Sequence, residues 1–182
     1  LLGSLYYAFK ADLRNIKAVC NLEFCGNGDF LAIWPVKTRE RGLPLLQEIR
    51  KAACEIDLLF KSVHVPWPYM SSDHLSFRLM GFKNALTLSL IPNHQVPVLE
   101  KMVQNIGLKG YFPRRQAMPE PLSVIHSRYD TSDRLSEESM QLMLALLLQM
   151  IRNDSHGKFP GPTRRHIVHQ ADQVSGRSAD YV

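Results

Sequence analysis

Hydrophobic and polar positions along this chain follow two kinds of pattern, and together they predict strands separated by helices. Three stretches are nearly continuous in apolar residues, as buried strands are. They are residues 16–24 (IKAVCNLEF), 30–35 (FLAIWP) and 84–92 (NALTLSLIP). We expect the first to be a central strand, and we expect Pro35 to stop the second because proline cannot donate to a sheet.

Helical spacing is clearest after Pro44, where apolar residues recur at 45, 46, 49, 52, 53, 56, 59 and 60. Proline at the first position of a helix favours this start. The other predicted helices are residues 3–13, a short helix within residues 71–82, residues 96–107 and residues 136–152. The short helix within 71–82 follows a polar loop. Ser4 and Ser136 are candidate N-caps, and Gly107 is a candidate helix end.

This alternation of strands and helices predicts an α/β layered domain with a largely parallel or mixed sheet. Residues 107–124 contain five glycines and prolines, which indicates a long loop of the kind that often carries function. We place the domain at residues 1–152. Residues 153–182 are polar with little periodicity, so we expect a flexible tail there.

Composition narrows the class of protein without identifying it. The 182 residues are 45% hydrophobic and 21% charged, which fits one globular domain. The longest apolar run, 142–148, is too short to span a membrane. The net charge of +5 comes with no basic run interleaved with aromatic residues, so we expect no nucleic-acid partner. Because the three cysteines include no CxxC pair, we expect no disulfide framework.

Glu23, near the end of the first predicted strand, is the first residue whose chemistry needs an explanation. Burying a carboxylate is costly unless it is paired, hydrogen-bonded or bound to a metal. Glu23 therefore either faces outward near the strand end or serves as a metal ligand at the carboxyl end of the strand, where ligands of α/β sheets bind.

Two further polar stretches offer a similar choice. In SSDHLSF (71–77), Asp73 is either part of an N-cap or a group that orients a ligand. In IHSRYD (125–130), His126 is either a surface histidine or a metal ligand oriented by Asp130. Composition and spacing leave these alternatives open.

Taken in order, five stretches resemble the zinc-dependent aminopeptidase family, which includes bacterial leucyl aminopeptidases and the related glutaminyl cyclases. They are LLGS (1–4), AVCNLEFCGNGD (18–29), SSDHLSFRLMGF (71–82), NALTLSLIP (84–92) and IHSRYDTSDRLSEES (125–139). The resemblance covers about residues 1–152. It implies a three-layer α/β/α sandwich around a mixed, largely parallel sheet, with two zinc ions above the sheet.

By this resemblance Glu23 and His126 are metal ligands, and Asp73 is a supporting group. Asp130, as the group that could orient His126, is the second supporting residue. The family usually has Asp where this chain has Glu23, a longer side chain that also binds zinc. Peptides are the implied substrates, and metal-activated water cleaves their N-terminal residues. Neither a membrane nor a nucleic acid is an expected partner.

The resemblance also implies that the other metal ligands and the general base lie upstream of residue 1, so no catalytic residue is assigned in this chain. We therefore expect a carboxy-terminal portion of the fold that hydrolyses nothing when made alone. Two other functions stay open: a non-catalytic interaction module with the same fold, and a glutaminyl cyclase-like acyltransferase.

Overall fold

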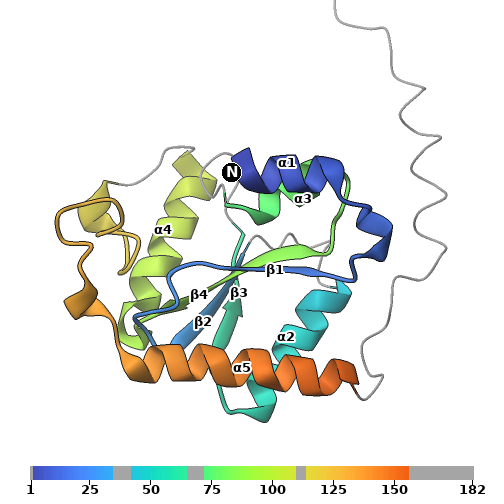
Figure 1. Ribbon diagram of the computed structural model, residues 1–182. Coiled ribbons are helices and arrows are strands. Elements are labelled where there is room, and N and C mark those ends of the chain that lie inside the picture. Colours follow the sequence, from blue (N-terminus) through green and yellow to red (C-terminus); the bar gives the residue numbers. More distant parts are fainter. Residues whose placement is uncertain (1, 35–41, 65–71, 110–113, 156–182) are drawn as a thin grey trace, which may run out of the picture.

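The computed structural model describes residues 2–34, 42–64, 72–109 and 114–155. Within these ranges helices and strands alternate along the chain (Figure 1). The strands are β1 (Val19–Leu22), β2 (Phe30–Trp34), β3 (Phe60–Ser62) and β4 (Ala85–Ile91). The α-helices are α1 (Leu2–Lys10), α2 (Pro44–Glu55), α3 (His74–Leu79), α4 (Val96–Lys109) and α5 (Glu137–Ser155).

The four strands form a mixed sheet in the order β1-β4-β2-β3. β1 pairs parallel with β4, and β3 pairs parallel with β2. These two parallel pairs meet antiparallel at β2 and β4, with Ile33 opposite Leu88. The predicted mixed, largely parallel sheet is therefore confirmed.

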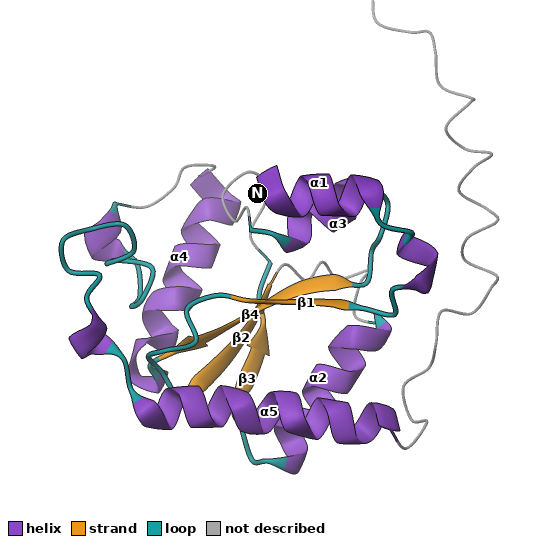
Figure 2. Cartoon of the chain, in the orientation of Figure 1, coloured by secondary structure: helices purple, strands orange, loops and turns teal. Residues whose placement is uncertain are grey.

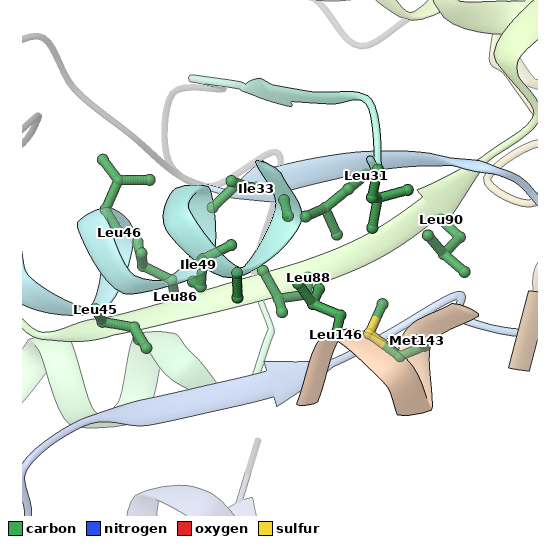
Figure 3. Close-up of a cluster of buried hydrophobic side chains, with 13 residues drawn as sticks. Leu31, Ile33, Leu45, Leu46, Ile49, Leu86, Leu88, Leu90, Met143 and Leu146 are labelled. Carbon is green, nitrogen blue, oxygen red and sulfur yellow. The ribbon is translucent and has the colours of Figure 1, made fainter. Parts of the chain in front are cut away.

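Helices cover both faces of this sheet, as a three-layer sandwich requires (Figure 2). On one face, α2 and α5 pack on alternate residues of β2 and β4, as Figure 3 shows for Leu31, Leu88 and Met143. On the other face, α4 packs against Trp34, and α1 and α3 pack against Ala85. Because both faces are covered, every residue of β2 and β4 is buried. The predicted α/β/α fold is confirmed.

The end of α2 differs from the prediction, which carried helical spacing on to residue 60. The helix ends at Glu55, and Asp57 adopts a left-handed backbone with φ of 55°. The N–H of Leu58 then donates to the carbonyl of Ala53 at 2.9 Å, as in a Schellman motif. No glycine marks this stop, so the sequence pattern missed both the helix end and the following strand β3.

β1 is shorter and more exposed than the predicted central strand at residues 16–24. It is an edge strand of the described sheet, and none of its four residues is fully buried. Ser4 is not an N-cap, because it lies inside α1. An apolar sequence at an open sheet edge is unusual.

The helices α4 and α5 form where they were predicted, and each extends a few residues past its predicted carboxy-terminal end. α4 continues two residues past Gly107, to Lys109. Ser136 caps α5 as predicted, since its hydroxyl accepts the N–H of Ser139 at 3.2 Å. α5 runs to Ser155 and so includes the first residues of the predicted tail; residues 156–182 lie outside the described ranges. None of the described helices combines the length and hydropathy needed to cross a bilayer.

Candidate metal centre

Glu23 is the first residue after β1, at the carboxyl end of that strand. Its N–H donates to the carbonyl of Leu88 in β4 at 3.0 Å, and its side chain is half-buried. The next residue, Phe24, has a left-handed backbone with φ of 57° and packs against the buried cluster that contains Met118 and Leu122. The turn at Phe24 therefore ends the extended strand just after the candidate ligand.

The loop that follows Glu23 is held firmly to its surroundings. The hydroxyl of Ser139 in α5 accepts the N–H of Gly28 and donates to the Gly28 carbonyl, both at 2.8 Å. Asp29 accepts the N–H of Asn93 at 2.6 Å through its carboxylate. Gly28 has φ of 136°, and a Cβ there would lie 2.5 Å from the carbonyl carbon of Ile91, so only glycine fits.

His126 lies in the long loop between α4 and α5. Its side chain is exposed, and its backbone is left-handed, with φ of 55°. The carboxylate of Asp130 accepts the backbone N–H of His126 at 3.2 Å. Asp130 thus fixes the turn that carries the imidazole. This loop ends at Ser136, whose N–H donates to the carbonyl of Gly26 at 2.7 Å, so the His126 loop and the Glu23 loop are joined there.

Asp73 is exposed at the start of α3. It occupies the N-cap position of α3, as one of the two alternatives predicted, but its side chain makes no capping hydrogen bond there. Its carboxylate instead accepts a hydrogen bond from the Ser4 hydroxyl at 2.8 Å, which lowers the pKa of Asp73. Asp73 therefore links α3 to α1.

A buried polar cluster next to Asp73 was missed by the sequence reasoning. His74 is 1% exposed, and its Nδ1 lies 2.7 Å from the Thr87 hydroxyl and 3.2 Å from the Ser72 hydroxyl. The side-chain amide of Asn21 in β1 donates to both hydroxyls. The signal for this cluster was Thr87 itself, since a polar residue inside a fully buried strand requires a partner.

Burial keeps this histidine neutral. It lowers the pKa of His74 to about 4, with the nearby Arg78 charge acting in the same direction and Asp73 opposing it. Among the residues that the structure describes, none hydrogen-bonds to His74 Nε2. The cluster ties β1 to β4 two residues before Glu23, and so it fixes the strand that ends at the candidate ligand.

A match to a model of a known protein family decides the family of this chain. The family model for peptidase family M28 matches residues 1–151. The chain belongs to peptidase family M28. Together with the solved structure described next, this match confirms the predicted relation to the zinc aminopeptidase family.

A solved structure supports the M28 fold. A zinc aminopeptidase from Bacillus subtilis superimposes with a TM-score of 0.57 at 17% sequence identity. The match covers 85% of this chain and 32% of the Bacillus chain, so this chain spans about a third of that protein. No curated protein matches the sequence. At this identity the likeness concerns the fold.

The M28 chain offers suitable donor types for zinc but too few of them. Carboxylate and imidazole, as in Glu23 and His126, are common zinc ligands, and a catalytic site uses about three protein ligands per ion. Within the described ranges, no group of three or more His, Cys, Asp and Glu side chains could hold a metal ion. Glu23 and His126 therefore stay predictions as ligands, as do Asp73 and Asp130 as supporting groups.

Proposed function

We propose that this chain contributes metal ligands to a zinc-dependent hydrolase that removes N-terminal residues from peptides. The observation that carries the proposal is the M28 family match over residues 1–151, which spans both Glu23 and His126. In this proposal Glu23 and His126 bind zinc, while the general base and further ligands come from polypeptide outside this chain. A bound zinc ion would polarise the scissile carbonyl and activate the attacking water.

The backbone at the two candidate ligands supports this assignment. Left-handed conformations at residues other than glycine cost about 1–2 kcal/mol each and cluster at functional sites. Among the described residues they occur at Phe24, Asp57 and His126. Asp57 ends α2, whereas Phe24 follows one candidate ligand and His126 is the other. The fold therefore maintains strained turns where the proposal needs fixed side chains.

In this proposal the supporting groups hold the elements that carry the candidate ligands in place. Asp130 accepts the His126 backbone N–H, so it sets the turn from which the imidazole projects. The Asn21, Thr87 and His74 cluster fixes β1 on β4 and thereby the direction in which Glu23 leaves the strand. Asp73 holds α3 against α1 through Ser4.

The test is hydrolysis of an aminoacyl amide by the full-length gene product. We expect zinc-dependent turnover in the wild type and its loss, by about a hundredfold or more, in Glu23→Gln and His126→Ala. The matched control is His94→Ala, because His94 is also an exposed histidine and lies in the 3₁₀ helix Asn93–Gln95. The 182-residue chain alone should hydrolyse nothing.

Other outcomes would reject the proposal in favour of another function. Unchanged turnover in both ligand variants would remove Glu23 and His126 from the site. Release of ammonia from N-terminal glutaminyl peptides, without cleavage of aminoacyl amides, would indicate a glutaminyl cyclase-like acyltransferase. Absence of both reactions in a folded, zinc-supplied full-length product would favour a non-catalytic interaction module.

A further inference from the structure

The turn that carries His126 is fixed by a dense set of hydrogen bonds. The N–H and the hydroxyl of Ser127 both donate to the carbonyl of Val124, at 3.1 and 2.6 Å. The Ser127 hydroxyl also accepts the N–H of Tyr129 at 3.1 Å, and the Ser127 carbonyl accepts the N–H of Asp130 at 3.1 Å. Together with the bond from the His126 N–H to Asp130, these contacts hold the turn in one conformation.

Arg128, within this turn, presents an exposed guanidinium that is itself held in place. Its Nη2 donates to the hydroxyl of Tyr129 at 2.6 Å, and its guanidinium carbon lies 4.8 Å from the centre of the Tyr129 ring. Arginine stacked on an aromatic ring in this way loses part of its side-chain freedom before any ligand binds. A guanidinium has more N–H donors than the one that Tyr129 accepts, so it retains donors for a further acceptor.

Two carboxylates of the same loop are engaged elsewhere and do not neutralise Arg128. Asp130 accepts the N–H of His126, and Glu120 pairs with Arg134 at 3.0 Å. Among the residues that the structure describes, none forms an ion pair with Arg128. The turn therefore carries a positive charge that is available to a ligand.

The loop that contains Arg128 lies at the edge of the sheet where the candidate metal ligands stand. Ser136, at the end of this loop, donates its N–H at 2.7 Å to the carbonyl of Gly26, in the loop after Glu23. Figure 1 shows the loop between α4 and α5, coloured from yellow to orange, on the side of the molecule where β1 ends. Arg128 follows His126 by two residues, so their Cα atoms are at most about 7 Å apart.

This separation matches the dimensions of a short peptide. In the proposed function, His126 is a ligand of the zinc ion that would hold the scissile carbonyl. A carboxylate one or two residues beyond the scissile bond lies about 4–7 Å from it, by the spacing of consecutive Cα atoms. A guanidinium on the same turn as the zinc ligand can reach such a carboxylate, and its planar fork of donors suits a bidentate pair with the two oxygens.

We propose that Arg128 recognises a substrate carboxylate on the carboxyl side of the scissile bond, with Tyr129 as the residue that positions its guanidinium. The substrate class is short peptides that carry a carboxylate one or two residues beyond that bond. This carboxylate belongs to the free carboxy terminus or to an acidic side chain, and both present the same pair of oxygens. The inference rests on the proposed hydrolase and adds a substrate class to it.

The experiment uses the full-length gene product and two peptides, leucylglycine and its carboxy-terminal amide. The measured quantity is the ratio of kcat/KM for the dipeptide to kcat/KM for the amide. We expect this ratio to fall about fivefold in Arg128→Gln, because an exposed ion pair contributes up to about that factor. Comparing the ratio between proteins cancels the intrinsic difference in reactivity between the two peptides.

The matched control is Arg152→Gln, since Arg152 is also exposed but lies in the last turn of α5. It should leave the ratio unchanged. Arg128→Lys keeps the charge without the planar fork, so it should lower the ratio by less than Arg128→Gln does. If Arg128 were only structural, its substitution would change the turnover of both peptides by the same factor, and that outcome would overturn the proposal.

Two further measurements test how the guanidinium acts. Tyr129→Leu should lower the same ratio, because Arg128 then loses both the ring and the hydroxyl that hold it; an unchanged ratio would overturn the positioning role of Tyr129. High salt should shrink the difference between wild type and Arg128→Gln, because about 1 M salt screens exposed charges beyond about 3 Å. A difference that is independent of salt would contradict recognition by charge.

A second pair of peptides separates the two sources of the carboxylate. Leucylaspartate with an amidated carboxy terminus and its asparagine counterpart differ only in the acidic side chain. If Arg128→Gln lowers the aspartate-to-asparagine ratio, Arg128 binds the side chain; if it lowers only the leucylglycine ratio, Arg128 binds the carboxy terminus. If neither ratio falls although the wild type hydrolyses these peptides, the role of Arg128 is overturned and the hydrolase stands. A folded, zinc-supplied wild type that hydrolyses none of them would reject the proposed function itself.

Discussion

The imidazole of His74 lies 2.7 Å from the hydroxyl of Thr87, between α3 and the fully buried strand β4. The Asn21 amide joins the same cluster from β1, so one buried histidine links a helix and two strands. The cluster requires the neutral imidazole, because a charged ring at 1% exposure would lose its hydration.

The first prediction is a loss of stability in acid that depends on His74. An imidazole in the unfolded chain takes up its proton near pH 6.5, whereas burial lowers the pKa of His74 to about 4 in the fold. The unfolded state therefore binds more protons between these values, and stability falls as the pH drops from 6.5 toward 4. The loss from this residue is about 3 kcal/mol.

Urea unfolding at pH 7.5, 5.5 and 4.5 measures this effect in wild type and His74→Gln. The variant should lose less stability than the wild type across the same range, because glutamine does not titrate. Parallel curves for the two proteins would show that other groups cause the acid sensitivity.

The second prediction concerns the loop after Glu23. Gly28→Ala should destabilise the chain by about 2–4 kcal/mol, because the new Cβ would meet the Ile91 backbone at 2.5 Å in addition to its unfavourable φ. Gly81→Ala is the matched control, since Gly81 also has a positive φ but nothing lies near its Cβ. Thermal unfolding of the two variants should separate the clash from the backbone strain; equal losses would argue against the close approach.

The third prediction concerns the contact between that loop and α5. Ser139→Ala removes the partner of both the N–H and the carbonyl of Gly28, so it should cost about 1–3 kcal/mol in unfolding free energy. Ser155→Ala, which removes an exposed hydroxyl at the end of the same helix, should change it by less than about 0.5 kcal/mol. A Ser139→Ala variant as stable as the Ser155→Ala control would mean that the loop is held by other contacts.

The fourth prediction is a difference in thiol reactivity. Burial raises the pKa of Cys20 to about 12 and that of Cys25 to about 11, whereas the thiol of Cys54 is exposed. Because the thiolate is the reactive form, Cys54 should react with a disulfide reagent at pH 8 well before the other two. Titrating the thiols of the native and the urea-unfolded chain, with Cys54→Ala as the comparison, measures the order in which they react. A fast phase that survives in Cys54→Ala would contradict it.

The sequence was most informative where a pattern and a stop signal agreed. Pro44 begins α2, and the apolar run before Pro92 is the fully buried strand β4. The sequence pattern did not predict the end of α2, because a left-handed turn at Asp57 ends this helix without a glycine. It also took β1 for a central strand, because its apolar pattern suits a strand covered on both faces while the described sheet ends there.

For the candidate site, residue types were easier to predict than contacts. Glu23 does stand at the carboxyl end of a strand, as its sequence context indicated. Asp130 was expected to orient the His126 ring, yet its carboxylate accepts the backbone N–H. The His74 cluster joins residues far apart in sequence, Asn21, Ser72 and Thr87, and no local pattern could bring them together.

Zinc content is the most direct test of the central claim that Glu23 and His126 are metal ligands. Elemental analysis would be made on the purified full-length gene product and on its Glu23→Gln and His126→Ala variants, with His94→Ala as the control. The account predicts bound zinc in the wild type and in His94→Ala, and loss of zinc from both ligand variants. Full zinc retention in Glu23→Gln and His126→Ala, or no zinc in a folded wild type, would contradict it.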